Sequence, residues 1–241
     1  MKANTNLGTL FLIPSPLGDN PPLEVLPLAI KTKVEELNYF IVENEKNARR
    51  FIKKLTPSKN QESLLFFPLN KYTTQEEFNT FLNPCLEGKS MGLMSDAGTP
   101  GIADPGALIV AKAHKMGLTV KPLSGPSSLI LALMSSGMNG QNFAFNGYLP
   151  VDQKARKQMI LKLEKKGMRE NQAQLFIETP YRNQSLFKDL LATLAPTTLL
   201  CVGCELTLAT EFIKTLTVKE WKSQRPNLEK KPCIFIIEAG F

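Results

Sequence analysis

Short apolar runs alternate along the chain with longer segments in which apolar residues recur every three or four positions. The short runs predict strands and the longer segments predict helices. Strands that alternate with helices are typical of a parallel sheet covered by helices. In the first half, strands are expected at residues 9–13, 39–43, 64–67, 91–94 and 118–123, and helices at residues 23–36, 48–55, 74–86 and 107–116.

The second half continues in the same style and ends richer in strands. A helix is expected at 126–136, strands at 142–148 and 174–177, a helix at 183–194, strands at 198–204 and 233–238, and a charged turn region at 211–216. With 241 residues, the chain is long enough for two α/β domains. We expect these domains at residues 1–124 and 125–241, because Ser124 and Gly125 mark a turn between the two halves.

The chain has no pattern typical of an exported or membrane protein. Its polar start is followed by an apolar run, residues 10–13, that reaches Pro14 too early for a secretory leader. No apolar run approaches the roughly eighteen residues of a membrane span. We therefore expect a cytoplasmic protein with reduced cysteines. Cys201 and Cys204 form a C-x-x-C pair, but no second pair matches it and the single histidine, His114, is distant, so we expect no metal site.

The positive charge is concentrated in the second half. The net charge is +7, and residues 1–123 hold 14 Lys and Arg against 12 Asp and Glu, which leaves 15 against 10 for residues 124–241. The stretch 154–169 predicts a helix with Met159, Ile160 and Leu163 on one face and basic residues around the rest. A similar basic run covers 46–55. Such runs are usually solvated helix faces, and the alternative is a polyanionic partner such as RNA.

The segment SDAGTPGIADPG, residues 95–106, lies between a predicted strand and a predicted helix. Three glycines remove side chains from this loop and two prolines stiffen it, so its shape is set before a ligand arrives. A simple connection needs only about two to six residues, which favours a binding role. Asp104, followed by Pro105, is interpreted as a cap of the next helix.

Two further loops have the same character. IPSPLGD, residues 13–19, follows the first predicted strand, and LSGPSSL, residues 123–129, follows the fifth. In a parallel sheet these loops lie at one edge, where ligands bind. Neither contains a G-x-G-x-x-G motif or a Walker lysine, which speaks against nicotinamide and nucleoside triphosphate cofactors. The pattern indicates a small ligand held mainly by backbone groups.

Six blocks in this order resemble the S-adenosylmethionine-dependent tetrapyrrole methylase superfamily. They are LFLIPSPLGD, MGLMSDAGTPGIADPG, KPLSGPSSLILALMSSG, FAFNGYLP, LFIETPYRNQSLFKDL and CELTLATEF, and they span nearly the whole chain. The resemblance is strongest to the branch of ribosomal small-subunit RNA 2′-O-ribose methyltransferases. It implies two α/β domains with S-adenosyl-L-methionine in the cleft between them, and a homodimer.

The resemblance also implies which residues contact the cofactor. Alternatives stay open for the side chains: Tyr148 packs in the core, Ser127 and Ser128 cap a helix, and Cys204 packs in a strand. Glu178 would approach from the second domain beside Tyr148 and Cys204. The implied cofactor-binding residues are Pro16, Ala97, Gly98, Ile102, Ala103, Ser127, Ser128, Tyr148 and Cys204.

The chemistry of methyl transfer requires little from ionisable groups, because a sulfonium methyl is already activated and alignment supplies most of the acceleration. A hydroxyl acceptor would still benefit from a general base. Asp96 is the first hypothesis for that base, Glu178 the second and Glu43 the third; alternatively, Asp96 only fixes its loop by bonding to backbone N–H groups. ETPYR, residues 178–182, resembles the family's Glu-Ser-Pro-His-Arg block, where Arg182 suits an RNA phosphate.

Two departures from the family pattern weaken the inference about the acceptor. VENEK, residues 42–46, keeps Glu43 of the branch's Ala-Glu-Asp-Thr-Arg motif but not the Asp-Thr-Arg, and the sequence stops at IIEAGF without the helical tail common in that branch. Ribosomal RNA is the leading acceptor. A tetrapyrrole or other small acceptor, a non-catalytic module that binds S-adenosylmethionine and RNA, and, last, a Rossmann-type oxidoreductase are the alternatives.

Overall fold

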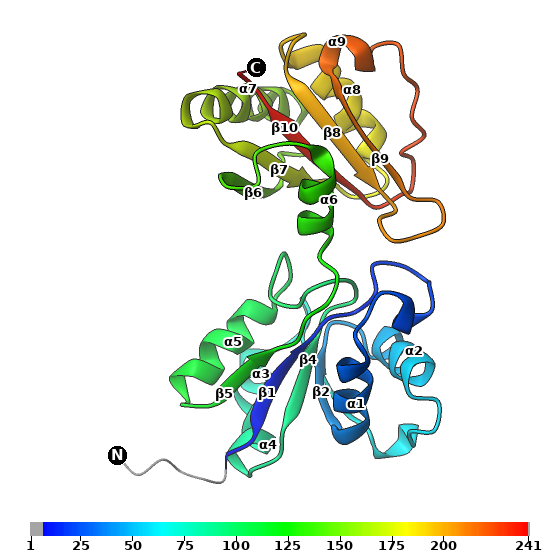
Figure 1. The fold of residues 1–241 in the computed structure, drawn as a ribbon. Coiled ribbons are helices and arrows are strands. Elements are labelled where there is room, and N and C mark those ends of the chain that lie inside the picture. Colours follow the sequence, from blue (N-terminus) through cyan, green and yellow to red (C-terminus); the bar gives the residue numbers. More distant parts are fainter. Residues whose placement is uncertain (1–6, 241) are drawn as a thin grey trace. The chain divides into compact units, whose positions relative to one another are not determined.

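The computed structural model describes residues 7–240, so the polar start on which we predicted the absence of a leader lies outside the described residues. The chain forms two compact units, Met1–Ser127 and Ser128–Phe241, drawn in Figure 1. The division falls three residues after the predicted boundary at residue 124. Between residues 7 and 240, every helix is too short or too polar to cross a membrane.

The first unit is built on a five-stranded parallel sheet, which confirms the α/β fold class predicted from the alternating pattern. The strand order is β3-β2-β4-β1-β5, and all four neighbouring pairs are parallel. The middle strand β4 is buried at every position, as expected for a strand covered on both faces. The strands are β1 (Thr9–Ile13), β2 (Tyr39–Val42), β3 (Leu65–Pro68), β4 (Met91–Met94) and β5 (Thr119–Pro122).

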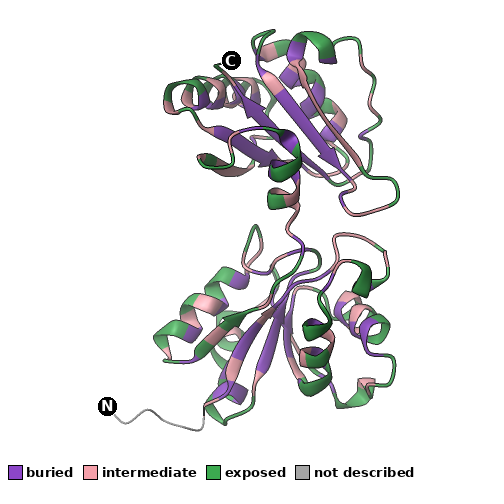
Figure 2. Ribbon diagram, in the orientation of Figure 1, coloured by how far each residue is buried: buried purple, intermediate pink, exposed green. Residues whose placement is uncertain are grey.

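Helices cover both faces of this sheet, because successive strand residues point to opposite sides. Phe11 and Phe40 pack with α1 (Leu28–Glu36) and α2 (Glu45–Leu55) in one core. Leu10 and Ile41 face the other core, which includes residues of α4 (Asn83–Leu86) and α5 (Gly106–Lys115). Figure 2 shows the buried strands between these partly exposed helices. Three short elements complete the unit: η1 (Pro22–Glu24), η2 (Gln61–Ser63) and α3 (Gln75–Thr80).

Two helices predicted in this unit are divided in the structure. The helix expected over 23–36 is interrupted, because Pro27 has an extended backbone with ψ of 144° and α1 begins only after it. The helix expected over 74–86 separates into α3 and α4. Pro84 lies in the first turn of α4, where its missing N–H costs no hydrogen bond.

The second unit is built on a mixed sheet of order β6-β7-β10-β8-β9. Only the β6–β7 pair is parallel, and the other three pairs are antiparallel. Residues of α7, α8 and α9 pack in the core on one face, while Thr215 of β9 donates to the carbonyl of Ser136 in α6 on the other. The elements are α6 (Ser128–Ser136), β6 (Phe143–Tyr148), α7 (Gln153–Glu170), β7 (Ala173–Ile177), α8 (Asn183–Thr193), β8 (Leu199–Cys204), β9 (Phe212–Thr217), α9 (Val218–Trp221) and β10 (Cys233–Glu238).

The turn region predicted over 211–216 is wrong, because this segment is strand β9. It pairs with β8 along its whole length, from Leu199 opposite Thr217 to Cys204 opposite Phe212. Lys214 interrupts the apolar alternation and hid the strand from the pattern. A lysine is well tolerated on an edge strand, where it discourages pairing with another chain.

Helix α7 carries the basic run of the second half and contains one cation that points inward. Ile160 and Leu163 are buried as predicted, whereas Met159 is only partly buried. Arg156, one of the basic residues of this run, is 5% exposed. Its guanidinium lies 2.5 Å from the carboxylate of Asp189, which is also buried. The free-energy cost of burying the arginine is therefore offset by an ion pair with good hydrogen-bond geometry.

Candidate functional site

The loops after β1 and β4 are joined by reciprocal backbone hydrogen bonds. The N–H of Ser15 donates to the carbonyl of Gly98 over 2.9 Å, and the N–H of Gly98 donates to the carbonyl of Ser15 over 3.0 Å. Gly98 has a φ of +74°, a conformation that favours glycine. The hydroxyl of Ser15 adds a bond of 2.9 Å to the carbonyl of Ser95. These contacts fix Pro16 and Ala97, two predicted cofactor-binding residues, on adjoining loops.

The loop after β5 packs directly against the other two. A Cβ placed on Gly125 would lie 2.3 Å from the Cβ of Pro14, so only glycine allows this approach. The hydroxyl of Thr99 donates to the carbonyl of Pro126 over 3.2 Å. The three loops therefore lie together at one edge of the parallel sheet, as the sequence predicts. Ser127 follows immediately in this loop.

The loop between β4 and α5 is held from within by Asp104. Its carboxylate accepts the N–H of Gly101 over 2.8 Å and the N–H of Gly106 over 2.7 Å. Burial raises the pKa of this carboxyl group, and the two backbone bonds oppose the rise. The predicted capping role is only partly right, because the cap position of α5 is Pro105 and Asp104 instead bridges two turns of the loop.

Three predicted cofactor residues project from this fixed loop. Ala97, Ile102 and Ala103 are exposed, whereas Gly98 beside them is buried. Ala103 has a φ of +62°, an uncommon conformation for a residue with a side chain. Backbone strain of this kind costs about 1–3 kcal/mol and concentrates at binding sites. The rest of the loop holds Ala103 in this conformation.

Asp96 lies at the end of β4 in contact with Glu43 and α2. The N–H of Asp96 donates to Oε1 of Glu43 over 3.0 Å, and Oδ2 of Asp96 accepts the side-chain amide of Asn47 over 3.0 Å. Burial raises the pKa of Glu43; the N–H bond from Asp96 lowers it, and the charges of Asp104 and Asp96 raise it further. Two of the three predicted general bases are thus brought together, and the carboxylate of Asp96 bonds to an amide side chain.

A pocket of about 360 Å³ opens beside Asp96, within the size range of small-molecule sites. The first loop and the end of β4 supply one wall, and α2 supplies the other. The α2 residues of this wall were not predicted as site residues, because polar positions on an amphipathic helix carry no signal of their own. The lining residues are Ser15, Pro16, Leu17, Gly18, Asp19, Asn20, Pro22, Asn47, Arg50, Phe51, Lys54, Asp96 and Ala97.

Within the second unit, three predicted residues lie at one edge of the mixed sheet. Tyr148 at the end of β6 pairs with Ile177, and Glu178 follows that residue. Cys204 ends β8, which runs in the direction of β7 because both are antiparallel to β10. Tyr148 is 58% exposed, so it is not the core aromatic of the alternative interpretation. Ser128 is the first residue of α6.

Glu178 and Arg182 form an ion pair with unused hydrogen-bonding capacity. Oε1 of Glu178 accepts the N–H of Thr179 and an Nη2 proton of Arg182, both over 2.6 Å. This bond raises the pKa of Arg182. Within residues 7–240, Oε2 of Glu178 and Nε of Arg182 are buried without a hydrogen-bond partner. Since buried polar groups normally have partners, these two atoms mark a place where a ligand would be stabilised.

The thiol of Cys204 is occupied inside the core. Its Sγ lies 3.0 Å from Sγ of Cys233, the residue opposite it on β10. The hydrogen bond between the two thiols lowers the pKa of Cys204 and raises that of Cys233. Cys201 is also buried, and no group of three or more potential metal ligands occurs among residues 7–240. The side chain of Cys204 therefore supports packing more directly than cofactor contact.

Comparison with known proteins places these features in a family. No family model matches the chain. Ribosomal RNA small subunit methyltransferase I of Thermotoga maritima is 31% identical over 185 residues, which cover 77% of this chain and 78% of that protein. The protein of the same name from Buchnera aphidicola subsp. Schizaphis graminum is 29% identical over 244 residues, covering 100% and 81%.

Solved structures show the same fold at low identity. The methyltransferase CobJ has a TM-score of 0.63 at 16% identity, covering 96% of this chain and 94% of that chain. Uroporphyrin-III C-methyl transferase from Thermus thermophilus, complexed with S-adenyl homocysteine, has a TM-score of 0.56 at 15% identity, covering 96% and 97%. The chain belongs to the ribosomal RNA small subunit methyltransferase I family.

Proposed function

We propose that this protein transfers a methyl group from S-adenosylmethionine to a ribose 2′-hydroxyl in the RNA of the small ribosomal subunit. The names of its relatives support the RNA acceptor. The observation that carries the proposal is the junction of the three loops, where Ser15 and Gly98 exchange backbone hydrogen bonds and Gly125 packs against Pro14. Such a junction positions backbone groups for a ligand before it arrives.

The residues of the first unit fit this methyl donor. Ala97, Ile102 and Ala103 leave their loop open to solvent, and the pocket beside Asp96 has the volume of a small-molecule site. Pro16, Gly98 and the other predicted contacts would hold S-adenosylmethionine mainly through the backbone. When bound, this group supplies a methyl already activated by the positive charge on its sulfur.

Asp96 is the general base in this proposal. Its carboxylate would take the proton of the acceptor hydroxyl as that oxygen gains the methyl group. Asn47 holds Oδ2 of Asp96, and Glu43 holds its N–H, so the carboxylate is oriented from both sides. A base in this position contributes about 10²–10⁴ to the rate. In the second unit, the unpartnered atoms of Glu178 and Arg182 are proposed to bind the acceptor.

The proposal further includes a cytoplasmic homodimer that works without a metal ion. Ribosomal RNA as acceptor supports the cytoplasmic location. Light scattering on the purified protein tests the dimer, and activity that survives treatment with a chelator tests the independence from metal.

A methyl-transfer assay on the full chain tests the function. Small ribosomal subunits from a strain lacking this protein are incubated with tritiated S-adenosylmethionine, and the label is mapped by nuclease digestion. Subunits from the parent strain, already methylated, are the matched control. Label in ribose of the deletion-strain RNA alone is the expected result. Salt-sensitive RNA binding without label would point to a non-catalytic module. Label that enters uroporphyrinogen in a parallel incubation, with none in the subunits, would point to a small acceptor.

A further inference from the structure

Helix α2 presents a row of cations beside the proposed methyl-donor pocket. Its eleven residues include Lys46, Arg49, Arg50, Lys53 and Lys54 against one acid, Glu45. Three apolar side chains on the opposite face, Ala48, Ile52 and Leu55, are buried in the core. Packing of that face fixes the helix and leaves the basic face in solvent. The net charge of this basic face depends on which of its cations form ion pairs with acidic residues.

Two of these cations are neutralised by neighbouring acids. Arg49 lies 2.8 Å from the carboxylate of Glu45 and donates to the backbone carbonyl of Gln61 over 2.7 Å. Lys54 forms an ion pair with Asp19. Both side chains therefore already have an acidic partner within the protein.

Two further cations of α2, Arg50 and Lys53, form no ion pair within residues 7–240. Arg50 donates to the side-chain oxygen of Asn47 over 3.2 Å, and this partner is a neutral amide. Lys53 has no ion pair among the described residues and is exposed. Because the two lie three positions apart on one helix, they are separated by about 4.5 Å along the axis.

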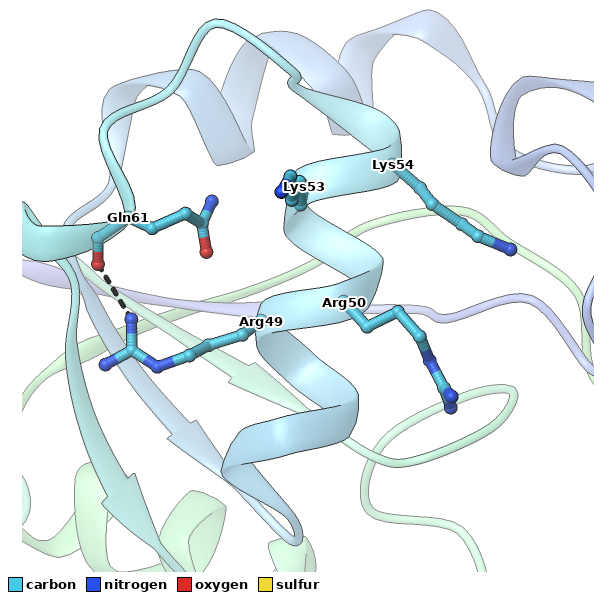
Figure 3. Close-up of a pocket in the computed structure, with 5 residues that line it drawn as sticks. All are labelled: Arg49, Arg50, Lys53, Lys54 and Gln61. Atoms are coloured by element: carbon cyan, nitrogen blue, oxygen red, sulfur yellow. Dashed lines mark hydrogen bonds between the residues drawn. The ribbon is translucent and has the colours of Figure 1, made fainter.

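These residues border a groove of about 480 Å³, lined by Arg49, Arg50, Lys53, Lys54 and Gln61. Figure 3 shows Arg49 turned toward Gln61 on one side of the helix, Arg50 and Lys54 extending to the other, and Lys53 between them. A solvated helix face would explain the charges alone. The groove also shares two lining residues, Arg50 and Lys54, with the pocket beside Asp96, which a merely solvated helix face does not require.

A chain of hydrogen bonds connects the groove with the methyl-transfer site. Arg50 donates to Oδ1 of Asn47, and Nδ2 of Asn47 donates to Oδ2 of Asp96. Arg50 is therefore two hydrogen bonds away from the proposed general base, and an anion bound at Arg50 would lie one bond further. Polyanionic RNA fits an open groove with several cations better than a single small anion does, since phosphates recur along its backbone.

We propose that the basic face of α2 binds the RNA backbone next to the acceptor nucleotide, with Arg50 and Lys53 each contacting a phosphate. This inference rests on the proposed function, because the RNA is its acceptor. The guanidinium of Arg50 can bind a phosphate through two parallel hydrogen bonds, and the ammonium of Lys53 acts as a point charge. Such contacts position the strand without reading its sequence.

Fluorescence anisotropy with small-subunit ribosomal RNA measures these contacts. The variants are Lys53→Gln and the double variant Arg50→Gln/Lys53→Gln, and the matched control with the same charge change is Lys115→Gln/Lys121→Gln on exposed positions of α5 and β5. Each lost phosphate contact to a single strand lowers the slope of log affinity against log salt by about 0.7. Between 1 M and 0.1 M salt this corresponds to about 5-fold weaker binding for the single variant and about 25-fold for the double variant.

Circular dichroism confirms that each variant is folded, and titration of Lys53→Gln with S-adenosylhomocysteine is expected to match wild type. RNA affinity and salt slope equal to those of the control pair would overturn the inference while leaving the methyltransferase proposal intact. If the variants bind RNA more weakly but the wild-type protein transfers no methyl group, the RNA-binding surface is upheld and the proposed function is rejected. Absence of RNA binding by the wild-type protein would reject both.

Discussion

Replacement of Gly125 by alanine tests the loop junction on which the proposed site depends. The new Cβ would lie 2.3 Å from Cβ and 2.6 Å from Cγ of Pro14, both atoms of a rigid ring. An ordinary contact begins near 3.4 Å, so the first and third loops must separate by about 1 Å. Neither side can relieve the clash by rotating a flexible side chain.

The cost of this overpacking is about 1–3 kcal/mol of unfolding free energy. For a chain of this size, that change lowers the melting temperature by about 2–12 °C. The separation also misplaces the proposed methyl-donor site, and a shift of about 1 Å in positioning groups can reduce the rate about 100-fold. We therefore expect Gly125→Ala to lose both stability and methyl transfer.

The matched control is Gly140→Ala in the second unit, where the added Cβ meets nothing within 4 Å. Thermal unfolding with and without S-adenosylhomocysteine, followed by methyl transfer to deletion-strain subunits, compares the two variants. The reasoning would be refuted if Gly125→Ala had the same melting temperature and the same methyl-transfer rate as the control. The loops would then accommodate a Cβ that the observed distances exclude.

Three further predictions concern single side chains. Asp96→Asn is expected to lower kcat by about 10²–10⁴ with unchanged affinity for S-adenosylhomocysteine, and wild-type turnover would exclude its role as base. Burial raises the pKa of Glu43 above its usual 4.5, so its contribution to stability is fully present below pH 4.5 and is lost as pH rises through the raised pKa. The melting temperature of Glu43→Gln should therefore rise relative to that of wild type as the pH increases. A difference in melting temperature that stays constant with pH would contradict the raised pKa. Arg156→Ala should cost about 3–5 kcal/mol in urea unfolding, against almost nothing for the exposed Lys154→Ala, because it leaves Asp189 buried without its closest cation; equal losses would show that the ion pair is unimportant.

The sequence predicts strands best where an apolar run is bounded by turn residues. The expected ranges 9–13, 91–94 and 233–238 are the observed bounds of β1, β4 and β10. Strand β9 was missed because Lys214 breaks its alternation, and partner strands, which no local pattern reveals, decide its conformation. The order of the strands in each sheet is equally invisible to a local pattern.

In the candidate site, too, the features set by local sequence could be predicted and those set by contacts between distant segments could not. Glycine and proline mark its loops, so the gathering of residues 13–19, 95–106 and 123–129 could be predicted. Asn47 and Arg50 could not, because their roles arise only when α2 packs beside the end of β4. The contact between Glu43 and Asp96 joins positions 53 residues apart and depends on the parallel pairing of β2 with β4.

The position of β1 in its sheet affects how the chain leaves the ribosome. Leu10 pairs with Met91 and Val120, so β1 waits for about 80 further residues to be synthesised before its first partner exists. At about 5–20 residues per second, this wait lasts about 4–16 s. During that time Leu10, Phe11 and Ile13 are an unpaired apolar segment of a nascent chain, which is the kind of segment that chaperones bind. The strand that leads into the first loop of the proposed site therefore waits longer for its first partner than any other strand of its sheet.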